Sequence, residues 1–164
     1  MIVIADTTPL NYLIRLGHSD LLREFYGRVL VPPAVLIEMK HAEAPPEVRA
    51  WARQPPEWLE EIEVQHIDKS IPVELGAGER EAISLAIEVQ ADLLLIDERA
   101  GRKEAEARHI PVAGTLAVLL QASLSGYIDF PEALKQLRQL GFRASRPIEE
   151  FVMTRYEQAK KLKP

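Results

Sequence analysis

The first ten residues, Met1-Ile2-Val3-Ile4-Ala5-Asp6-Thr7-Thr8-Pro9-Leu10, constrain the fold more than any other stretch of the chain. Their apolar start predicts a short buried strand. The Thr-Thr-Pro that follows predicts a helix start, with Thr7 or Thr8 as N-cap and Pro9 as the first helical residue. Asp6 would then stand at the carboxyl end of a central strand, where open α/β sheets bind ligands. The alternative is that Asp6 only caps the helix.

A second apolar run, Leu93-Leu94-Leu95-Ile96, is also followed directly by an acid, Asp97. Short apolar runs alternate with helical patterns along the chain, which predicts an α/β fold, a three-layer α/β/α sandwich with a largely parallel central sheet. Further strands are expected at residues 29–31 and 110–112 and within 59–67. Helices are expected over residues 9–16, 20–25, 34–39, 47–53, 79–89, 98–108, 114–124, 131–140 and 147–162. We predict a single domain over residues 1–164, with a C-terminal helical extension at about 130–164.

Composition excludes several classes of site and partner. The 164 residues include no Cys, so disulfides, thiolate metal sites and cysteine nucleophiles are excluded. A formal net charge of −5 disfavours indiscriminate nucleic-acid binding through a basic surface. No apolar run reaches membrane-spanning length, and no basic segment precedes a long apolar one at the start of the chain. We therefore expect a cytoplasmic protein with no membrane partner.

Four acids are expected to meet at one edge of the sheet: Asp6, Glu38, Glu79 and Asp97. The two aspartates follow strands, Glu38 stands inside an otherwise apolar helix, and Glu79 opens a helix after a glycine-rich turn. The simpler interpretations are that Glu38 lies on an exposed stripe and that Glu79 suits the helix dipole. Glu81, in the same helical turn, competes with Glu79 for the third position.

A set of carboxylates without His or Cys selects Mg²⁺ or Mn²⁺ rather than zinc. Such ions can clamp the attacking and leaving oxygens of a phosphodiester during its displacement, which is nuclease chemistry. Arg99 and Arg102 lie nearest to Asp97 in the sequence and are the two cations that could reach a phosphate. The remaining charges of residues 98–108 are expected to form a solvated helix face.

The ordered set Asp6-Thr7-Thr8-Pro9-Leu10, Glu38, Gly78-Glu79 and Leu94-Leu95-Ile96-Asp97 resembles a PIN domain. It is most similar to the prokaryotic branch related to ribonuclease toxins of type II toxin–antitoxin pairs, over roughly residues 1–125. The resemblance implies that Asp6, Glu38, Glu79 and Asp97 are catalytic and hold the metal, with Thr8 as the neighbouring hydroxyl. Glu79 stands where most members carry Asp, and Leu95 where many carry Thr or Ser.

These patterns and the resemblance together predict a Mg²⁺- or Mn²⁺-dependent endoribonuclease that hydrolyses single-stranded RNA. The resemblance further implies the toxin of a toxin–antitoxin pair, a homodimer, and an antitoxin protein as partner. Apolar residues near 116–124 and 151–156 are the candidate dimer surfaces. A PIN-fold nucleic-acid or protein binding module with weak or no catalysis is the alternative. An aspartyl-phosphate phosphatase is disfavoured, because position 8 carries Thr where such enzymes need a second acid.

Overall fold

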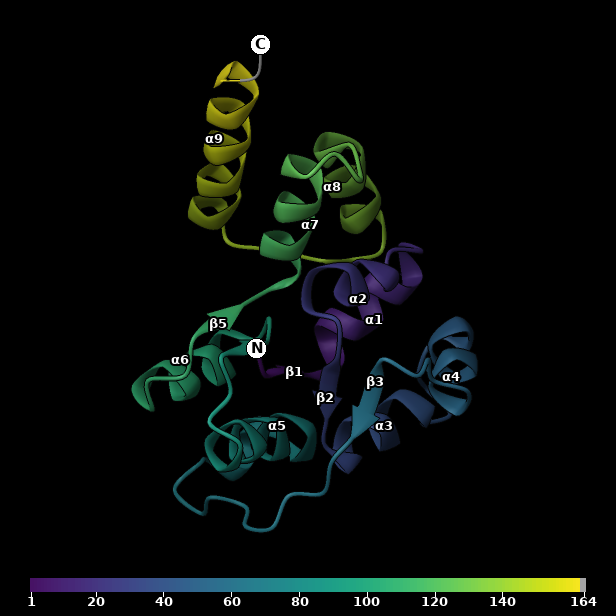
Figure 1. Cartoon of the computed structure of the whole chain (residues 1–164), viewed down its shortest axis with the longest axis vertical. Helices are drawn as coiled ribbons and strands as arrows, with labels where there is room; N and C mark the ends of the chain where they lie inside the picture. Colours follow the sequence, from purple (N-terminus) through teal and green to yellow (C-terminus); the bar gives the residue numbers. More distant parts are fainter. Residues whose placement is uncertain (163–164) are drawn as a thin grey trace. The chain divides into compact units, whose positions relative to one another are not determined.

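The computed structural model describes residues 1–162 and contains a five-stranded, fully parallel sheet (Figure 1). The strands run in the order β3-β2-β1-β4-β5. Helices flank this sheet, so the predicted α/β architecture with a parallel central sheet is confirmed. The strands are β1 (Val3–Ala5), β2 (Val29–Val31), β3 (Leu59–Glu61), β4 (Leu93–Leu95) and β5 (Val112–Ala113).

The strand order places a topological switch between β1 and β4. From β1 the chain builds outward through β2 to β3, and then returns to add β4 and β5 on the other side. Ile4 pairs with Leu30 on one side and with Leu94 on the other. Ligands of open α/β sheets bind outside the carboxyl ends of the strands at such a switch point. Asp6 and Asp97 follow the two strands that form it.

The first of two compact units is Met1–Gly114, which contains the whole sheet. Its α3 and α4 begin at Pro33 and Pro46, where a proline costs no helical hydrogen bond. Its helices are α1 (Thr7–Arg15), α2 (Asp20–Tyr26), α3 (Pro33–Lys40), α4 (Pro46–Arg53), the 3₁₀ turn η1 (Val73–Leu75), α5 (Ala77–Glu88) and α6 (Arg99–Ala107). Helix α5 packs on β1 and β4, and α3 packs on α5.

The predicted start of α1 is wrong by one to two residues. The N-cap position is occupied by Asp6 rather than Thr7 or Thr8, and Thr7 is already helical. The Asp6 backbone is extended because its amide still donates to Leu95 O, at 2.9 Å, in continuation of the β1–β4 ladder. The hydrogen bond to Leu95 therefore fixes the Asp6 backbone at the junction between β1 and α1.

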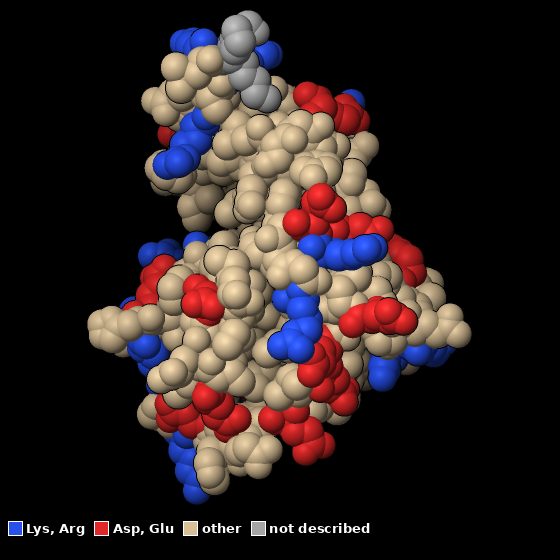
Figure 2. Space-filling view, viewed as in Figure 1, with Lys and Arg blue, Asp and Glu red and all other residues tan. Residues whose placement is uncertain are grey.

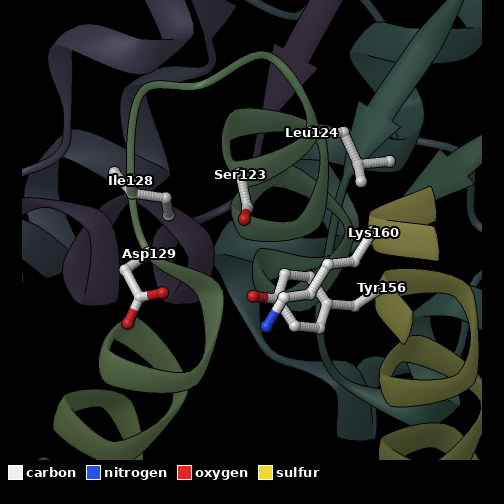
Figure 3. Close-up of a pocket in the computed structure, with 6 residues that line it drawn as sticks. All are labelled: Ser123, Leu124, Ile128, Asp129, Tyr156 and Lys160. Atoms are coloured by element: carbon white, nitrogen blue, oxygen red, sulfur yellow. The ribbon is translucent and has the colours of Figure 1, made fainter. Parts of the chain in front are cut away.

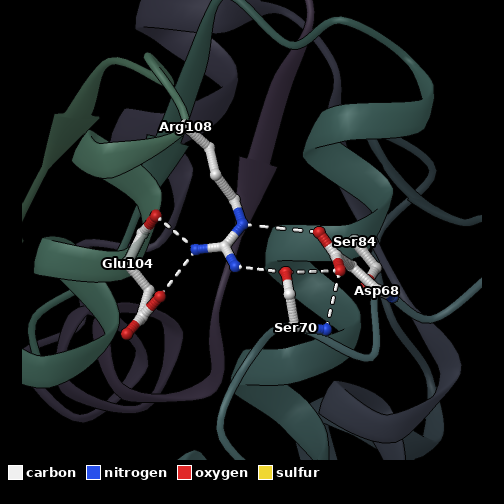
Figure 4. A network of polar contacts seen from close by, with 5 residues as sticks. All are labelled: Asp68, Ser70, Ser84, Glu104 and Arg108. Atoms are coloured by element: carbon white, nitrogen blue, oxygen red, sulfur yellow. Dashed lines mark hydrogen bonds and ion pairs between the residues drawn. The ribbon is translucent and has the colours of Figure 1, made fainter.

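The segment between β3 and α5 is anchored by Arg108 at the end of α6 (Figure 4). The guanidinium contacts Asp68 Oδ2 at 3.4 Å and Ser70 Oγ at 2.8 Å, and it binds Glu104 Oε2 at 2.6 Å. The Asp68 amide in turn donates to Ser84 Oγ of α5 at 2.9 Å. Arg108 therefore connects this segment to α6, and the Asp68 amide connects it to α5.

The second unit begins at Thr115. It consists of α7 (Thr115–Leu124), α8 (Phe130–Gln139) and α9 (Arg146–Leu162). Asp129 caps α8 by accepting the Glu132 amide at 3.2 Å, and the rings of Phe130 and Tyr156 lie 5.5 Å apart between α8 and α9. Within residues 1–162, no helix has the length and apolar character that crossing a membrane requires.

Candidate active site

Asp6 is a buried carboxyl group without the partners that burial normally requires. Its residue is 2% exposed, its side chain makes no capping hydrogen bond to α1, and Oδ1 has no hydrogen-bond partner. Burial raises the pKa of Asp6 to about 7, the Thr7 amide opposes the rise, and the charges of Glu38, Asp97 and Glu98 add to it. Capping therefore does not explain this carboxylate.

Glu38 is exposed at its position on α3, as the simpler interpretation of an exposed stripe expects. Its carboxylate is nevertheless fixed at both oxygens. Thr7 Oγ1 donates to Oε2 at 2.6 Å, and the Gly78 amide donates to Oε1 at 2.9 Å. These partners come from α1 and α5, so the Glu38 carboxylate joins three helices.

Glu79 and Glu81 face different neighbours although they share one turn of α5. Glu81 Oε1 accepts the Ala34 amide at 3.2 Å and thus satisfies a backbone donor in the first turn of α3. Glu79 lies among the other acids. Burial raises the pKa of Glu79 to about 7, and the charges of Asp6, Glu98 and Glu38 add to the rise. The geometry favours Glu79 as the group that belongs to the acidic cluster, and Glu81 as a capping residue.

Asp97 lies two residues beyond β4, beside Arg102 and Gly114. A Cβ at Gly114 would lie 2.6 Å from Asp97 Oδ1 and 2.9 Å from Arg102 Nη1, so both side chains border that glycine. Arg102 Nη1 also donates to Ile96 O at 3.2 Å, which holds the guanidinium close to the strand end. Of the two arginines predicted to reach a phosphate, Arg102 therefore lies beside Asp97 of the acidic cluster. Arg99 is an exposed residue at the start of α6.

Three glycines make room for three of the four acids. A Cβ at Gly78 would lie 2.6 Å from both Glu38 carboxylate oxygens, and one at Gly101 would lie 2.7 Å from Glu79 Oε2. Gly114 borders Asp97 in the same way. The other glycines have positive φ and open space around the missing Cβ; they are Gly17, Gly27, Gly76, Gly126 and Gly141. The glycines thus divide into turn formers and residues that border the acidic cluster.

Two members of this neighbourhood were not predicted from the sequence. Glu98 contributes charge to both Asp6 and Glu79, although it reads as part of a solvated helix face. The hydroxyl that contacts Glu38 belongs to Thr7, whereas Thr8 is half-buried one position farther along α1. The signal in the sequence that points to Glu98 is its position shortly after a strand. Asp97, the preceding residue, has the same signal, so it does not single out Glu98.

The carboxylate oxygens of the cluster suit a divalent cation, whereas the distances between the acids do not yet form a binding site for one ion. The unpartnered Asp6 Oδ1 and the mutual repulsion of the acids leave negative charge that an oxygen-preferring cation would compensate. Among residues 1–162, however, no group of three His, Asp or Glu side chains is gathered closely enough to hold one ion. The acids interact through their charges, but they do not form a closed ligand shell in this conformation.

Comparisons with known proteins agree with this architecture. A PIN domain family model matches residues 2–158. A solved structure, that of the PIN domain endonuclease Utp24, is similar over 68% of this chain and 83% of that chain, with a TM-score of 0.50 and 15% sequence identity. No curated protein matches the sequence. At that identity the solved structure speaks for the fold, and the family model covers nearly the whole chain. This chain belongs to the PIN domain family.

Proposed function

We propose that this protein is a Mg²⁺- or Mn²⁺-dependent endoribonuclease that hydrolyses phosphodiester bonds of single-stranded RNA. Membership of the PIN domain family supports a nuclease-type function in general. The preference for RNA, the metal dependence and the assignment of individual residues are our proposal. The Utp24 structure, titled an endonuclease, supports the fold on which the proposal is built.

The observation that carries the proposal is the pair Asp6 and Glu79. Both carboxyl groups have their pKa raised to about 7, chiefly by burial; the charge of Glu38 adds to both shifts, and the charge of Asp6 adds to that of Glu79. Perturbed carboxyl groups that face one another are typical of functional sites, because a fold gains no stability from them. A cation bound between them would remove the repulsion that the fold otherwise tolerates.

In this proposal Asp6, Glu38, Glu79 and Asp97 hold the cation through carboxylate oxygens. When bound, a divalent cation neutralises charge at the scissile phosphate and lowers the pKa of water there. Asp6 offers its unpartnered Oδ1. Thr7 and Gly78 orient Glu38 by donating to its two oxygens.

Phosphate binding is assigned to the start of α6. Arg102 is held near Asp97 by its bond to Ile96 O, so it can place a cationic group at the edge of the acids. Arg99 adds a second exposed cation in the first turn of the same helix. Arginine suits this task because its planar fork matches phosphate oxygens. Thr8, as the resemblance implies, is proposed to orient water or phosphate beside Asp6.

Cleavage of a mixed panel of single-stranded RNAs in Mg²⁺, Mn²⁺ or EDTA tests the proposal. We expect cleavage with either ion, none in EDTA, and a loss of about 100-fold or more in Asp6→Asn. Asp20→Asn, an exposed Asp-to-Asn change on α2, is the matched control and should cleave like the wild type. Equal cleavage in EDTA, or by Asp6→Asn, would contradict the proposal.

A binding module without catalysis is the second candidate function. It is favoured by one observation, that within residues 1–162 no three acids are gathered around a single ion position. A wild-type protein that binds Mn²⁺ and single-stranded RNA but cleaves none of the panel would support this candidate instead.

We also propose a toxin role and a homodimer, both implied by the resemblance. Production of the wild type, but not of Asp6→Asn, should arrest growth of a bacterial host, and an antitoxin partner should relieve the arrest.

For the dimer, the surface at 116–124 offers little exposed apolar area, because Leu116, Val118 and Leu119 are buried. Ile148 and Phe151 of α9 are 51% and 62% exposed and form the better surface. A monomeric mass in light scattering at micromolar concentration would contradict the dimer.

A further inference from the structure

Charge is divided unequally between the two units of the chain. Residues 1–114 contain 12 Lys and Arg against 20 Asp and Glu, a net charge of −8, whereas residues 115–164 contain 8 against 5, a net charge of +3. Figure 2 shows Lys and Arg side chains along α9 and clusters of Asp and Glu on the sheet-containing unit. A polyanion would be repelled by the first unit and attracted by the second.

The cationic character of α9 is concentrated toward its C-terminal half. The acids of its first turns are neutralised, since Glu149 pairs with Arg138 at 2.7 Å and Glu150 with Arg146 at 2.9 Å. Farther along, Lys160 Nζ lies 5.9 Å from the centroid of the Tyr156 ring. The Tyr156 ring also packs against Phe130 at 5.5 Å, so only the part of the ring that lines the groove can meet a ligand. Cationic groups and aromatic rings together line the grooves of proteins that bind single strands.

Lys160 and Tyr156 line a groove that lies entirely within the second unit (Figure 3). Its volume is about 200 Å³, and its other walls are Ser123, Leu124, Ile128 and Asp129. The apolar walls and the Tyr156 ring suit a flat base. Asp129 is the one acid among these lining residues, and its Oδ2 accepts the Glu132 amide at the start of α8.

We propose that this groove binds one nucleotide of a single-stranded RNA. Lys160 turns from the ring to contact a backbone phosphate, the Ser123 hydroxyl donates to the same strand, and the base packs against Leu124 and the part of the Tyr156 ring that lines the groove. The groove is smaller than the ~300–1,000 Å³ of sites for free small molecules, which favours one unit of a longer strand. An unpaired base is needed, because bases inside a duplex are not available for stacking. The proposal rests on the proposed function in taking RNA as the polyanion.

Fluorescence anisotropy with a labelled single-stranded RNA of ~12 nucleotides, in EDTA and over a salt series, tests the proposal. EDTA keeps cleavage out of the measurement. Lys160→Gln should weaken binding about three- to tenfold and reduce the salt dependence by about 0.7 in log–log slope, the value for one phosphate contact on a single strand. Lys135→Gln makes the same charge change on the exposed face of α8 and should weaken binding by less than about twofold. Lys160→Arg should restore the wild-type affinity.

Three results would overturn the proposal. Equal losses in Lys160→Gln and Lys135→Gln would mean that only net charge matters. Absence of RNA binding by the folded wild type would remove the ligand. A dimer in light scattering that Lys160→Gln dissociates would make the groove an interface between copies. Lys160-dependent RNA binding by a protein that cleaves nothing would uphold this inference and overturn the proposed function alone.

Discussion

The Gly78 amide donates a hydrogen bond to Glu38 Oε1 at 2.9 Å, and a Cβ at position 78 would lie 2.6 Å from the same oxygen. A side chain at position 78 would therefore displace the carboxylate that the amide orients. Gly78 lies inside the first turn of α5, where glycine costs about 1 kcal/mol relative to alanine. The three nearest atoms to a Cβ at this position all belong to the Glu38 carboxylate group.

Gly78→Ala should weaken Mn²⁺ binding about 10- to 100-fold, because the methyl group would displace Glu38 from its hydrogen bond. Isothermal titration calorimetry measures the affinity. Gly141→Ala is the control, since Gly141 has φ of +94° and open space around it. That change should cost about 1 kcal/mol of stability and leave Mn²⁺ affinity unchanged. Wild-type affinity in Gly78→Ala, with the higher stability expected of alanine in a helix, would contradict this account.

Thr7→Ala should reduce Mn²⁺ affinity about tenfold, whereas Thr7→Ser, which keeps the hydroxyl, should restore most of it. The loss of unfolding free energy should be about 1 kcal/mol or less, because Glu38 is exposed and can turn to solvent. Thr8→Ala, measured in parallel, separates the two hydroxyls. A larger loss in Thr8→Ala than in Thr7→Ala would show that the contact with Glu38 is not the one that matters.

Asp6→Asn should stabilise the metal-free protein above about pH 7 by about 1–3 kcal/mol. The folded-state pKa of Asp6, about 7, lies above the ordinary value of 3.8, so the folded state holds a proton that the unfolded state has lost. Wild-type stability from this group is therefore complete below about pH 4 and falls as the pH rises toward 7. Urea unfolding in EDTA across this range measures the effect. A variant that is less stable than the wild type at every pH would refute the prediction, and Asp20→Asn should track the wild type.

Arg108→Ala should release the segment between β3 and α5 without affecting the acidic cluster. Hydrogen exchange at the Asp68 and Ser70 amides should accelerate about tenfold, while the core strands keep their protection. Hydrogen bonds from Ser70, together with Arg108, lower the pKa of Asp68, so the contribution of Asp68 to stability is present above about pH 4 and lost below it. Arg53→Ala, at an exposed arginine on α4, is the control. Unchanged exchange at both amides would contradict the anchoring role.

The sheet and its two aspartates could be predicted from the sequence for a physical reason. Ile2 to Ala5 and Leu93 to Ile96 are short continuous apolar runs, which are typical of buried parallel strands, and an acid follows each run. Parallel strands bring their carboxyl ends to one edge, so Asp6 and Asp97 had to be neighbours. The helix start was mispredicted because the helix follows directly after the last ladder bond, from Asp6 to Leu95, and takes in both threonines that Thr-Thr-Pro marks as caps.

The remainder of the site depends on tertiary contacts that a sequence pattern does not contain. The choice between Thr7 and Thr8 is a rotation of one helical residue, about 100°. Glu38 is exposed on α3, and its carboxylate is fixed by donors from two other helices, Thr7 of α1 and Gly78 of α5. Gly101 and Gly114 carry no local turn signal, since what their missing side chains leave room for is set by tertiary contacts: Ile96 and Glu79 at Gly101, and Asp97 and Arg102 at Gly114.

The melting temperature at about pH 8, in EDTA and in Mn²⁺, tests most directly whether the acids await a cation. A ligand that binds only the folded state raises stability with its concentration, by about 2.7 kcal/mol at 100 times Kd. We predict that Mn²⁺ raises the melting temperature of the wild type, and that Asp6→Asn melts at the same temperature with and without the ion. An unchanged melting temperature in the wild type, or an equal rise in Asp6→Asn, would contradict the central claim that Asp6 and its neighbouring acids form a metal site.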